Sequence, residues 1–256
     1  FSVPLFFTGI LSFVVNWTDN FFIGRYLEPS QLGVYGVVFS IAMVLKLFQL
    51  VFTQVFKPMI AEKVSGEQTE EITFLFKKST AWIFAFTLPV FLVMFMYSKE
   101  VLRLVYGQDF IIGFLPLMIL CGGFLINVSL GLVGPILYAY GESDKIFYTN
   151  AFSAVLNVGL NAVLVPLYGI LGAAAASALT LILEELTTLY FAAKRQALRY
   201  DWLYMGKFLL AGIPAAIIGS RAFRLDLSLP VAVPVSAALY VGLYAALLLL
   251  FSTFEE

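Results

Sequence analysis

The sequence predicts an all-α, polytopic membrane protein with about eight transmembrane helices. Of its 256 residues, 61% are hydrophobic and 12% are charged, whereas about 25% are charged in an average soluble domain. The mean hydropathy is +0.96. A water-soluble fold of this length could not bury so much apolar side chain, so a soluble enzyme or nucleic-acid binder is excluded.

Long apolar stretches follow one another along the whole chain. Crossing a bilayer as a helix takes about 20 mostly apolar residues. Eight stretches meet this length approximately, at 1–23, 32–56, 79–97, 111–138, 146–165, 170–193, 203–219 and 229–251. Their Leu, Ala and Phe content favours helices, and they lack the strict alternation of barrel strands.

The connections between these stretches are short and contain turn residues. Glu28-Pro29-Ser30 separates the first two stretches, and residues 166–169 separate the fifth from the sixth. Short links make neighbouring helices antiparallel. The longest polar stretch is 57–78, whose second half, 70–78, is either a surface helix dipping into the interface or a solvated linker.

The distribution of Lys and Arg over the connections predicts the orientation. Loops rich in Lys and Arg face the cytoplasm. One side carries Arg25, Lys99, Arg103, Arg221 and Arg224, and the other carries Lys57, Lys63, Lys77, Lys78, Lys145, Lys194, Arg195, Arg199 and Lys207. The second side is therefore expected to be cytoplasmic, which places both ends of the chain there.

Composition also excludes several chemistries. The chain has no His and one Cys, and its formal net charge is -1. It therefore lacks the common general base, a disulfide, a multi-cysteine metal site and a basic surface for nucleic acid. No P-loop pattern is present. We expect no enzymatic activity, no cofactor and no metal. Because Phe1 opens directly into an apolar run, the chain is expected to be a fragment.

Lys46 lies near the middle of the second predicted helix. Steps of three and four place five further residues on its face of the helix, which is polar and aromatic apart from one alanine, namely Tyr35, Phe39, Ala42, Gln49 and Thr53. An ammonium at this depth attracts a phosphate or pairs with a carboxylate. Two interpretations follow: Lys46 lines a cavity, or it forms a structural ion pair.

Asn16 and Asp19 lie in the first predicted helix. Asp19 falls about 27 Å from the helix start, so it is expected near the outer surface and in contact with water. There it would line the mouth of a cavity or pair with a loop cation.

Two further groups of polar residues lie within predicted spans. Glu184 and Glu185 are candidates for ion coupling, with one paired to Lys46, or they extend toward Lys194 and Arg195 at the interface. Asn157 and Asn161 share a helix face, where they either contact sugar hydroxyls or bond to a neighbouring helix.

Several short motifs resemble one family of transporters. They are Phe1-Ser2-Val3-Pro4-Leu5, Trp17-Thr18-Asp19-Asn20-Phe21-Phe22-Ile23-Gly24, Leu32-Gly33-Val34-Tyr35-Gly36, Val105-Tyr106-Gly107-Gln108-Asp109-Phe110, and the run from Asn157 to Ala174 with its N-x-x-x-N and P-x-x-G-x-x-G-A-A spacing. In order and spacing they resemble the C-terminal half of Wzx-like polysaccharide-biosynthesis flippases, which belong to the multidrug/oligosaccharidyl-lipid/polysaccharide exporter superfamily.

This resemblance implies one lobe of a two-lobed exporter, with a six-helix lobe over 1–193, two additional helices over 194–256, and an N-terminal lobe that is missing here. It implies a multi-pass protein of the cytoplasmic membrane. Its substrate would be a polyprenyl-diphosphate-linked oligosaccharide, moved by alternating access for cell-surface glycan assembly. The implied partners are this substrate, membrane lipids and the missing lobe.

The resemblance also suggests roles for the polar residues within the spans. Lys46 would meet the diphosphate, and polar side chains around it would contact the head group, namely Gln49, Thr53, Asp19, Asn16, Asn157 and Asn161. The alternative within the superfamily is a cation-coupled drug antiporter using Glu184 or Glu185. A membrane-embedded glycosyl- or acyltransferase and a purely structural subunit are less well supported, because no catalytic loop motif is visible and a lysine lies within a span.

Overall fold

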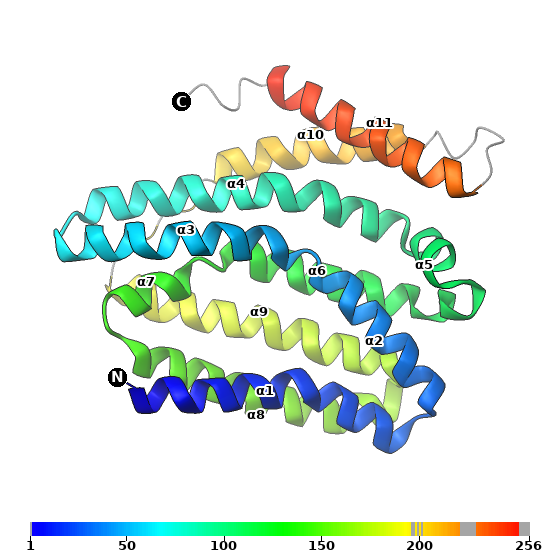
Figure 1. Cartoon of the computed structure of the whole chain (residues 1–256), viewed down its shortest axis with the longest axis horizontal. Coiled ribbons are helices and arrows are strands. Elements are labelled where there is room, and N and C mark those ends of the chain that lie inside the picture. The colour runs from blue at the N-terminus through cyan, green and yellow to red at the C-terminus, as the bar shows by residue number, and fades with distance from the viewer. Residues whose placement is uncertain (1, 196–197, 199, 201, 221–228, 251–256) are drawn as a thin grey trace.

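The computed structural model describes residues 2–195, 198, 200, 202–220 and 229–250. Within these ranges it contains helices and no strands (Figure 1). The elements are α1 (Ser2–Tyr26), α2 (Pro29–Met43), α3 (Lys46–Ser65), α4 (Thr69–Met96), α5 (Ser98–Tyr106), the 3-10 helix η1 (Gln108–Gly113), α6 (Phe114–Leu130), α7 (Val133–Ala139), α8 (Ser143–Tyr168), α9 (Ile170–Arg195), α10 (Trp202–Ser220) and α11 (Leu229–Leu250). The predicted all-α membrane fold is confirmed.

The helices stack in an order that differs from their order in the chain. From one edge of the molecule to the other, α1 packs on α8, α8 on α9, α9 on α6, α6 on α4, α4 on α10, and α10 on α11. In Figure 1 the long helices run roughly along one direction, with α3 beside α4 and α2 crossing in front of α6. Three clusters of buried apolar side chains lie between these layers.

Each predicted span coincides with helical structure, but the predicted number of spans is not confirmed. Four helical segments are long and apolar enough to cross a bilayer, at Thr69–Met96, Gln108–Ala139, Ser143–Tyr168 and Ile170–Lys194, and the bent pair α2 and α3 makes a fifth. The last residue of the eighth predicted stretch, 251, lies outside the described residues.

The turns around α8 confirm the short connections. Gly141 and Gly169 have φ values of 76° and 61°, which glycine adopts without a Cβ clash. Gly169 ends α8, and its amide donates to the Val165 carbonyl at 2.9 Å, so α9 can begin immediately afterwards at Ile170 and run antiparallel to α8.

The polar stretch before the third predicted span is part of a helix. Residues 70–78 form neither a separate surface helix nor a solvated linker, because α4 runs without interruption from Thr69 to Met96. Phe76 explains the difference. Its side chain is fully buried and packs edge-on against Tyr200, with ring centroids 5.0 Å apart, while Phe74 on the other face is exposed.

A short amphipathic helix that the sequence did not predict follows α4. In α5, Ser98 and Leu102 are buried one turn apart, and the side chains of Val105 and Tyr106 are exposed. Nine residues are too few to cross a bilayer. Its burial on one face and its position between two long helices are typical of a helix that lies along the membrane surface.

The second predicted span is broken. α2 ends at Met43 and α3 begins at Lys46, with a bend of 45° between them. Across the break, the amides of Val44, Leu45 and Leu47 each donate to the carbonyl three residues earlier, at 3.1, 3.2 and 3.1 Å. A short 3-10 pattern inside a long helix tightens the backbone locally and changes its direction.

Candidate functional site

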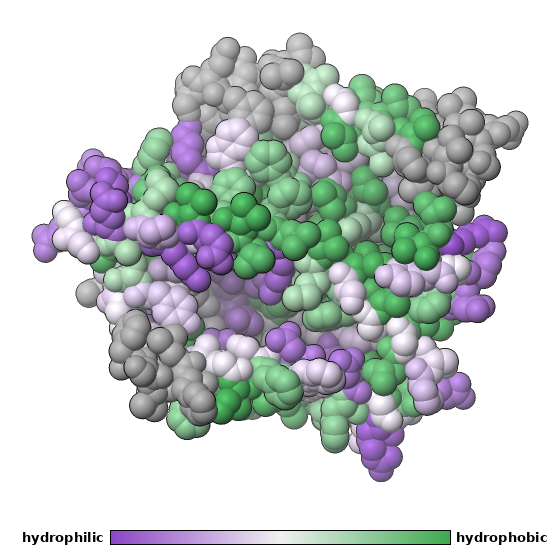
Figure 2. Space-filling view, in the orientation of Figure 1, coloured by the Kyte–Doolittle hydropathy of each residue, from purple (hydrophilic) through white to green (hydrophobic). Residues whose placement is uncertain are grey.

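A cavity of about 610 Å³ opens beside this break. It is lined by the end of α2, by one face of α3, and by Gly131, Pro135 and Tyr138 around α7. Figure 2 shows hydrophilic residues gathered in a hollow on this face of the molecule. The space is within the usual range for a ligand-binding cavity.

Lys46, Gln49 and Thr53, which share one face in the sequence pattern, all line the cavity. Because α3 begins at Lys46, its first turn also faces the cavity. The backbone amides of Val44, Leu45 and Leu47 at the break already donate to carbonyls three residues earlier, so the positive group at this end of α3 is the Lys46 ammonium.

The surroundings of Lys46 keep its ammonium group available. The Nζ atom lies 5.4 Å from the ring centroid of Phe124, which is 2% exposed. In the part of the chain that the structure describes, no carboxylate lies within 4 Å of this nitrogen. A cation over an aromatic face is stabilised by about 0.5–2 kcal/mol, which does not neutralise its charge.

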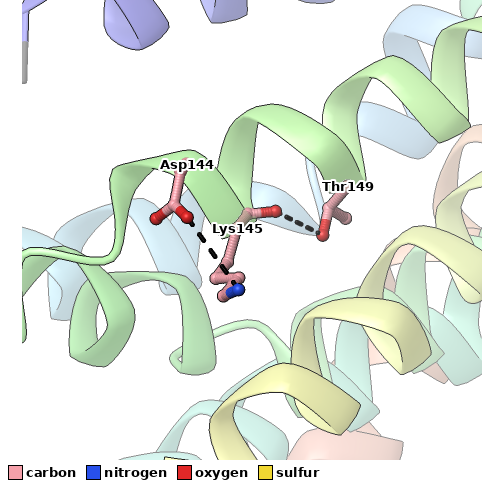
Figure 3. Close-up of polar contacts among 3 residues, drawn as sticks. All are labelled: Asp144, Lys145 and Thr149. Atoms are coloured by element: carbon pink, nitrogen blue, oxygen red, sulfur yellow. Dashed lines mark hydrogen bonds and ion pairs between the residues drawn. The ribbon is translucent and has the colours of Figure 1, made fainter.

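Lys145 provides a contrast at the start of α8. Its Nζ lies 3.9 Å from Asp144 Oδ2, and its backbone carbonyl accepts a hydrogen bond from Thr149 at 3.0 Å (Figure 3). Lys145 thus has a carboxylate within 4 Å of its ammonium group, whereas Lys46 interacts with Glu184 and Glu185 over a longer distance. Among the described residues, the Lys46 ammonium group has no direct ion pair.

Gln49 fixes the shape of the cavity. Its Nε2 donates to the Gly131 carbonyl at 2.8 Å and ties α3 to the end of α6. A Cβ atom at position 131 would lie 2.8 Å from Gln49 Cδ, so only glycine permits this approach. The bond holds the helix break open without a proline or glycine in α3 near the bend.

Sequence reasoning missed several residues of the lining. They are Lys57, Tyr138, Gln54 and Ser40. Lys57 lies eleven residues after Lys46, close to three full helical turns, and therefore on the same face. This periodicity was visible in the sequence, but Lys57 was assigned to a loop. Among the described residues, no Asp or Glu lines the cavity.

Asp19 lies away from the cavity and away from water. Its side chain is 4% exposed, so the expectation that it is in contact with water at the outer surface is wrong. The hydroxyls of Tyr35 and Ser177 donate to Oδ2, and Asn161 Nδ2 donates to Oδ1 at 2.8 Å. The carboxylate therefore joins α1, α2, α8 and α9.

The two asparagines of α8 belong to the same buried region. Asn157 and Asn161 are fully buried. Asn157 Nδ2 donates to Thr180 Oγ1 at 3.4 Å, which links α8 to α9. Their Oδ1 atoms have no hydrogen-bond partner among the described residues. Together with Asp19 these are the oxygen types that a hard cation prefers.

The remaining candidate residues are also outside the cavity lining. Asn16 is exposed on α1 and donates to the Ser12 carbonyl of its own helix at 2.8 Å. Glu185 is 8% exposed, and its Oε2 accepts from Asn127 Nδ2 at 3.3 Å. Glu184, beside it on α9, is partly buried. The roles of these residues stay predictions.

Comparisons with known proteins show which proteins this chain is similar to. Residues 1–112 match the polysaccharide biosynthesis protein family. The probable low-salt glycan biosynthesis flippase Agl15 of Haloferax volcanii is 23% identical over 211 residues, which cover 80% of this chain and 45% of that protein. The chain thus spans about half the length of this relative.

Solved structures share the fold. Lipid II flippase MurJ in an inward closed conformation superposes with a TM-score of 0.70 at 16% identity, covering 96% of this chain and 53% of that chain. An outward-facing multidrug resistance MATE family transporter of the MOP superfamily gives a TM-score of 0.64 at 14% identity, covering 96% of this chain and 63% of that chain. At these identities the likeness shows the shared fold.

The match over residues 1–112 and the similarity to Agl15 agree with the resemblance seen in the sequence motifs. The all-helical membrane fold is supported by both the sequence and the structure. Within this fold, the cavity beside Lys46 is a space lined by polar side chains, and Asp19 with its donors forms a buried junction of four helices.

Proposed function

We propose that the whole protein is a flippase that translocates a polyprenyl-diphosphate-linked oligosaccharide across the cytoplasmic membrane by alternating access, for cell-surface glycan assembly. The observation that carries the proposal is the cavity lined by Lys46 and Lys57 and, among the described residues, by no acidic side chain. Relatives named as a glycan biosynthesis flippase and a lipid II flippase support it.

The chemistry of the cavity suits the head group of such a lipid. A diphosphate brings two negative charges that cannot cross bare hydrocarbon. Lys46, at the broken helix, supplies a charge-assisted contact to the phosphates. Gln49, Gln54 and Thr53 supply amide and hydroxyl groups for sugars. The polyprenyl chain stays in the lipid, and both ends of this chain are proposed to face the cytoplasm.

A cation-coupled drug antiporter is the second candidate, since a MATE transporter shares the fold. The charge of the cavity disfavours it. Two lysines would repel an organic cation, and Glu184 and Glu185 do not belong to the described lining. We therefore place the flippase first.

The test is transport by the full-length protein in liposomes that contain a fluorescent polyprenyl diphosphoryl saccharide. Lys46→Gln should slow translocation about tenfold or more, since a hydrogen bond to a charged group contributes about 1.5–3 kcal/mol. Lys99→Gln is the matched control, because the Lys99 ammonium also lies over a ring, 4.3 Å from the Phe114 centroid, but outside the cavity. Equal rates in the two variants would contradict the proposal.

A further inference from the structure

Glu184 and Glu185 are adjacent in α9, and their carboxyl groups have few hydrogen-bond partners although they are buried or partly buried. Glu185 is 8% exposed and accepts one hydrogen bond, from Asn127 on α6. Glu184 interacts with it electrostatically as a second negative group. Two carboxylates held this close in a membrane interior are unfavourable unless a cation offsets them.

Lys46 is the cation that acts on both. It interacts electrostatically with Glu184 and with Glu185. Glu185 also interacts electrostatically with Tyr200, whose hydroxyl donates to the Leu130 carbonyl at 3.5 Å. In the described ranges no other lysine or arginine is found to act on either carboxyl group.

One layer of side chains separates the cavity from the acidic pair. Phe124, under the Lys46 ammonium, and Asn127, bonded to Glu185, lie three residues apart on the same face of α6. The cavity side of this layer is closed by Gln49 on Gly131, four residues further along the chain. Lys46 thus lies between the cavity proposed to bind an anion and the carboxyl groups of Glu184 and Glu185.

We propose that Glu184 and Glu185 are the internal counter-anion of Lys46 and compete with the phosphates of the substrate for its ammonium group. When the substrate binds, Lys46 turns to the diphosphate, and the acidic pair, having lost its cation, takes one proton from cavity water. The donor is a hydronium ion of the aqueous phase: one of its O–H bonds breaks, an O–H bond forms on a carboxylate oxygen, and a water molecule remains. This inference rests on the proposed function and links anion binding to the uptake of a proton.

The sign of the pH dependence follows directly. At low pH the acidic pair is protonated, Lys46 has no internal competitor, and the diphosphate binds more tightly. At high pH the pair is ionised and holds Lys46. For one coupled proton, the Kd changes by up to about tenfold per pH unit between these limits.

The experiment measures the Kd of the full-length protein in lipid nanodiscs for polyprenyl diphosphoryl N-acetylglucosamine between pH 5.5 and 8.5. The diphosphate of this probe carries no proton across that range, so its own charge stays constant. We expect the wild-type Kd to fall as the pH falls. The double variant E184Q/E185Q should bind about tenfold more tightly than wild type at pH 8 and should show no pH dependence.

Controls separate this inference from a structural role and from the proposed function. Glu70→Gln, at an exposed site, should keep the wild-type profile, and Lys46→Gln should bind weakly at every pH. Since glutamine can still accept from Asn127, the single variants E184Q and E185Q serve if the double variant does not fold. A flat wild-type profile, or unchanged or weaker binding in the Gln variants, overturns the inference while leaving the flippase intact. No binding by wild type at any pH overturns the proposed function itself.

Discussion

The Tyr35 hydroxyl of α2 donates to the Asp19 carboxylate of α1, and both side chains are buried. This contact joins the two helices of the first hairpin at a point where Ser177 of α9 and Asn161 of α8 also meet the carboxylate. A buried carboxylate needs several donors to offset its lost hydration, so the stability of this junction depends on each of them.

Tyr35→Phe should therefore destabilise the protein. It removes one donor from a buried carboxylate, and leaving such a group short of a partner costs about 1–3 kcal/mol. Thermal unfolding of the purified full-length protein checks this prediction. Tyr26→Phe is the matched control, since Tyr26 is 52% exposed. If both variants melt with wild type, the Asp19 cluster contributes nothing to stability.

Two adjacent glycines of α6 should respond in opposite ways to alanine. A Cβ at Gly123 would lie 2.7 Å from the Ala178 Cα of α9, whereas a Cβ at Gly122 would have nothing within 4 Å. Gly123→Ala must push α6 away from α9, at a cost of about 1–3 kcal/mol for overpacking. Gly122→Ala should be neutral or slightly stabilising, since alanine favours the helix by up to about 1 kcal/mol. Unfolding midpoints of the two variants measure the difference, and an equal shift in both would contradict the close α6–α9 packing.

The sequence was sufficient to predict where the long apolar helical stretches lie because bilayer thickness fixes the length of an apolar run. The side-chain period of a helix likewise placed Lys46, Gln49 and Thr53 on one face, and all three line the cavity. Both predictions use only neighbours along the chain, which are visible in one sequence.

The features that the sequence did not reveal depend on contacts between distant segments. The 45° break at residues 44–45 has no proline or glycine beside it, and a bond from Gln49 to Gly131, 82 residues away, holds it. Asp19 was expected to contact water because its position along the helix predicts its depth in the membrane. Which side of that helix faces the other helices is not visible in the sequence. Its donors come from three other helices, which no local pattern shows.

Lys57 and Lys46 should differ in their response to salt. Lys57 is exposed at the cavity, and exposed charges are screened as the Debye length falls from about 10 Å at 0.1 M to about 3 Å at 1 M. Lys57→Gln should weaken binding of the diphosphoryl sugar by about two- to fivefold at low salt and have no effect at 1 M. Lys46→Gln should remain impaired at 1 M, because its ammonium lies against buried Phe124. Binding curves of the two variants at low salt and at 1 M salt measure this difference. Identical salt responses would contradict the assignment of Lys57 to an exposed position and of Lys46 to a buried one.

The most direct test of the central claim, that Lys46 lies beside a watery cavity for a diphosphate head group, is the labelling of single cysteines. Cys121 is fully buried and is replaced by alanine together with any other cysteine of the full-length protein. Thr53→Cys lines the cavity, and Val155→Cys, at a side chain 76% exposed on α8, is the control on an apolar outer face.

A membrane-impermeant maleimide should label Thr53→Cys and not Val155→Cys, because thiol labelling needs water. Polyprenyl diphosphoryl N-acetylglucosamine should slow the labelling of Thr53→Cys at least severalfold. Thr53→Cys that stays unlabelled, or that labels at the same rate with and without the sugar lipid, would contradict the account.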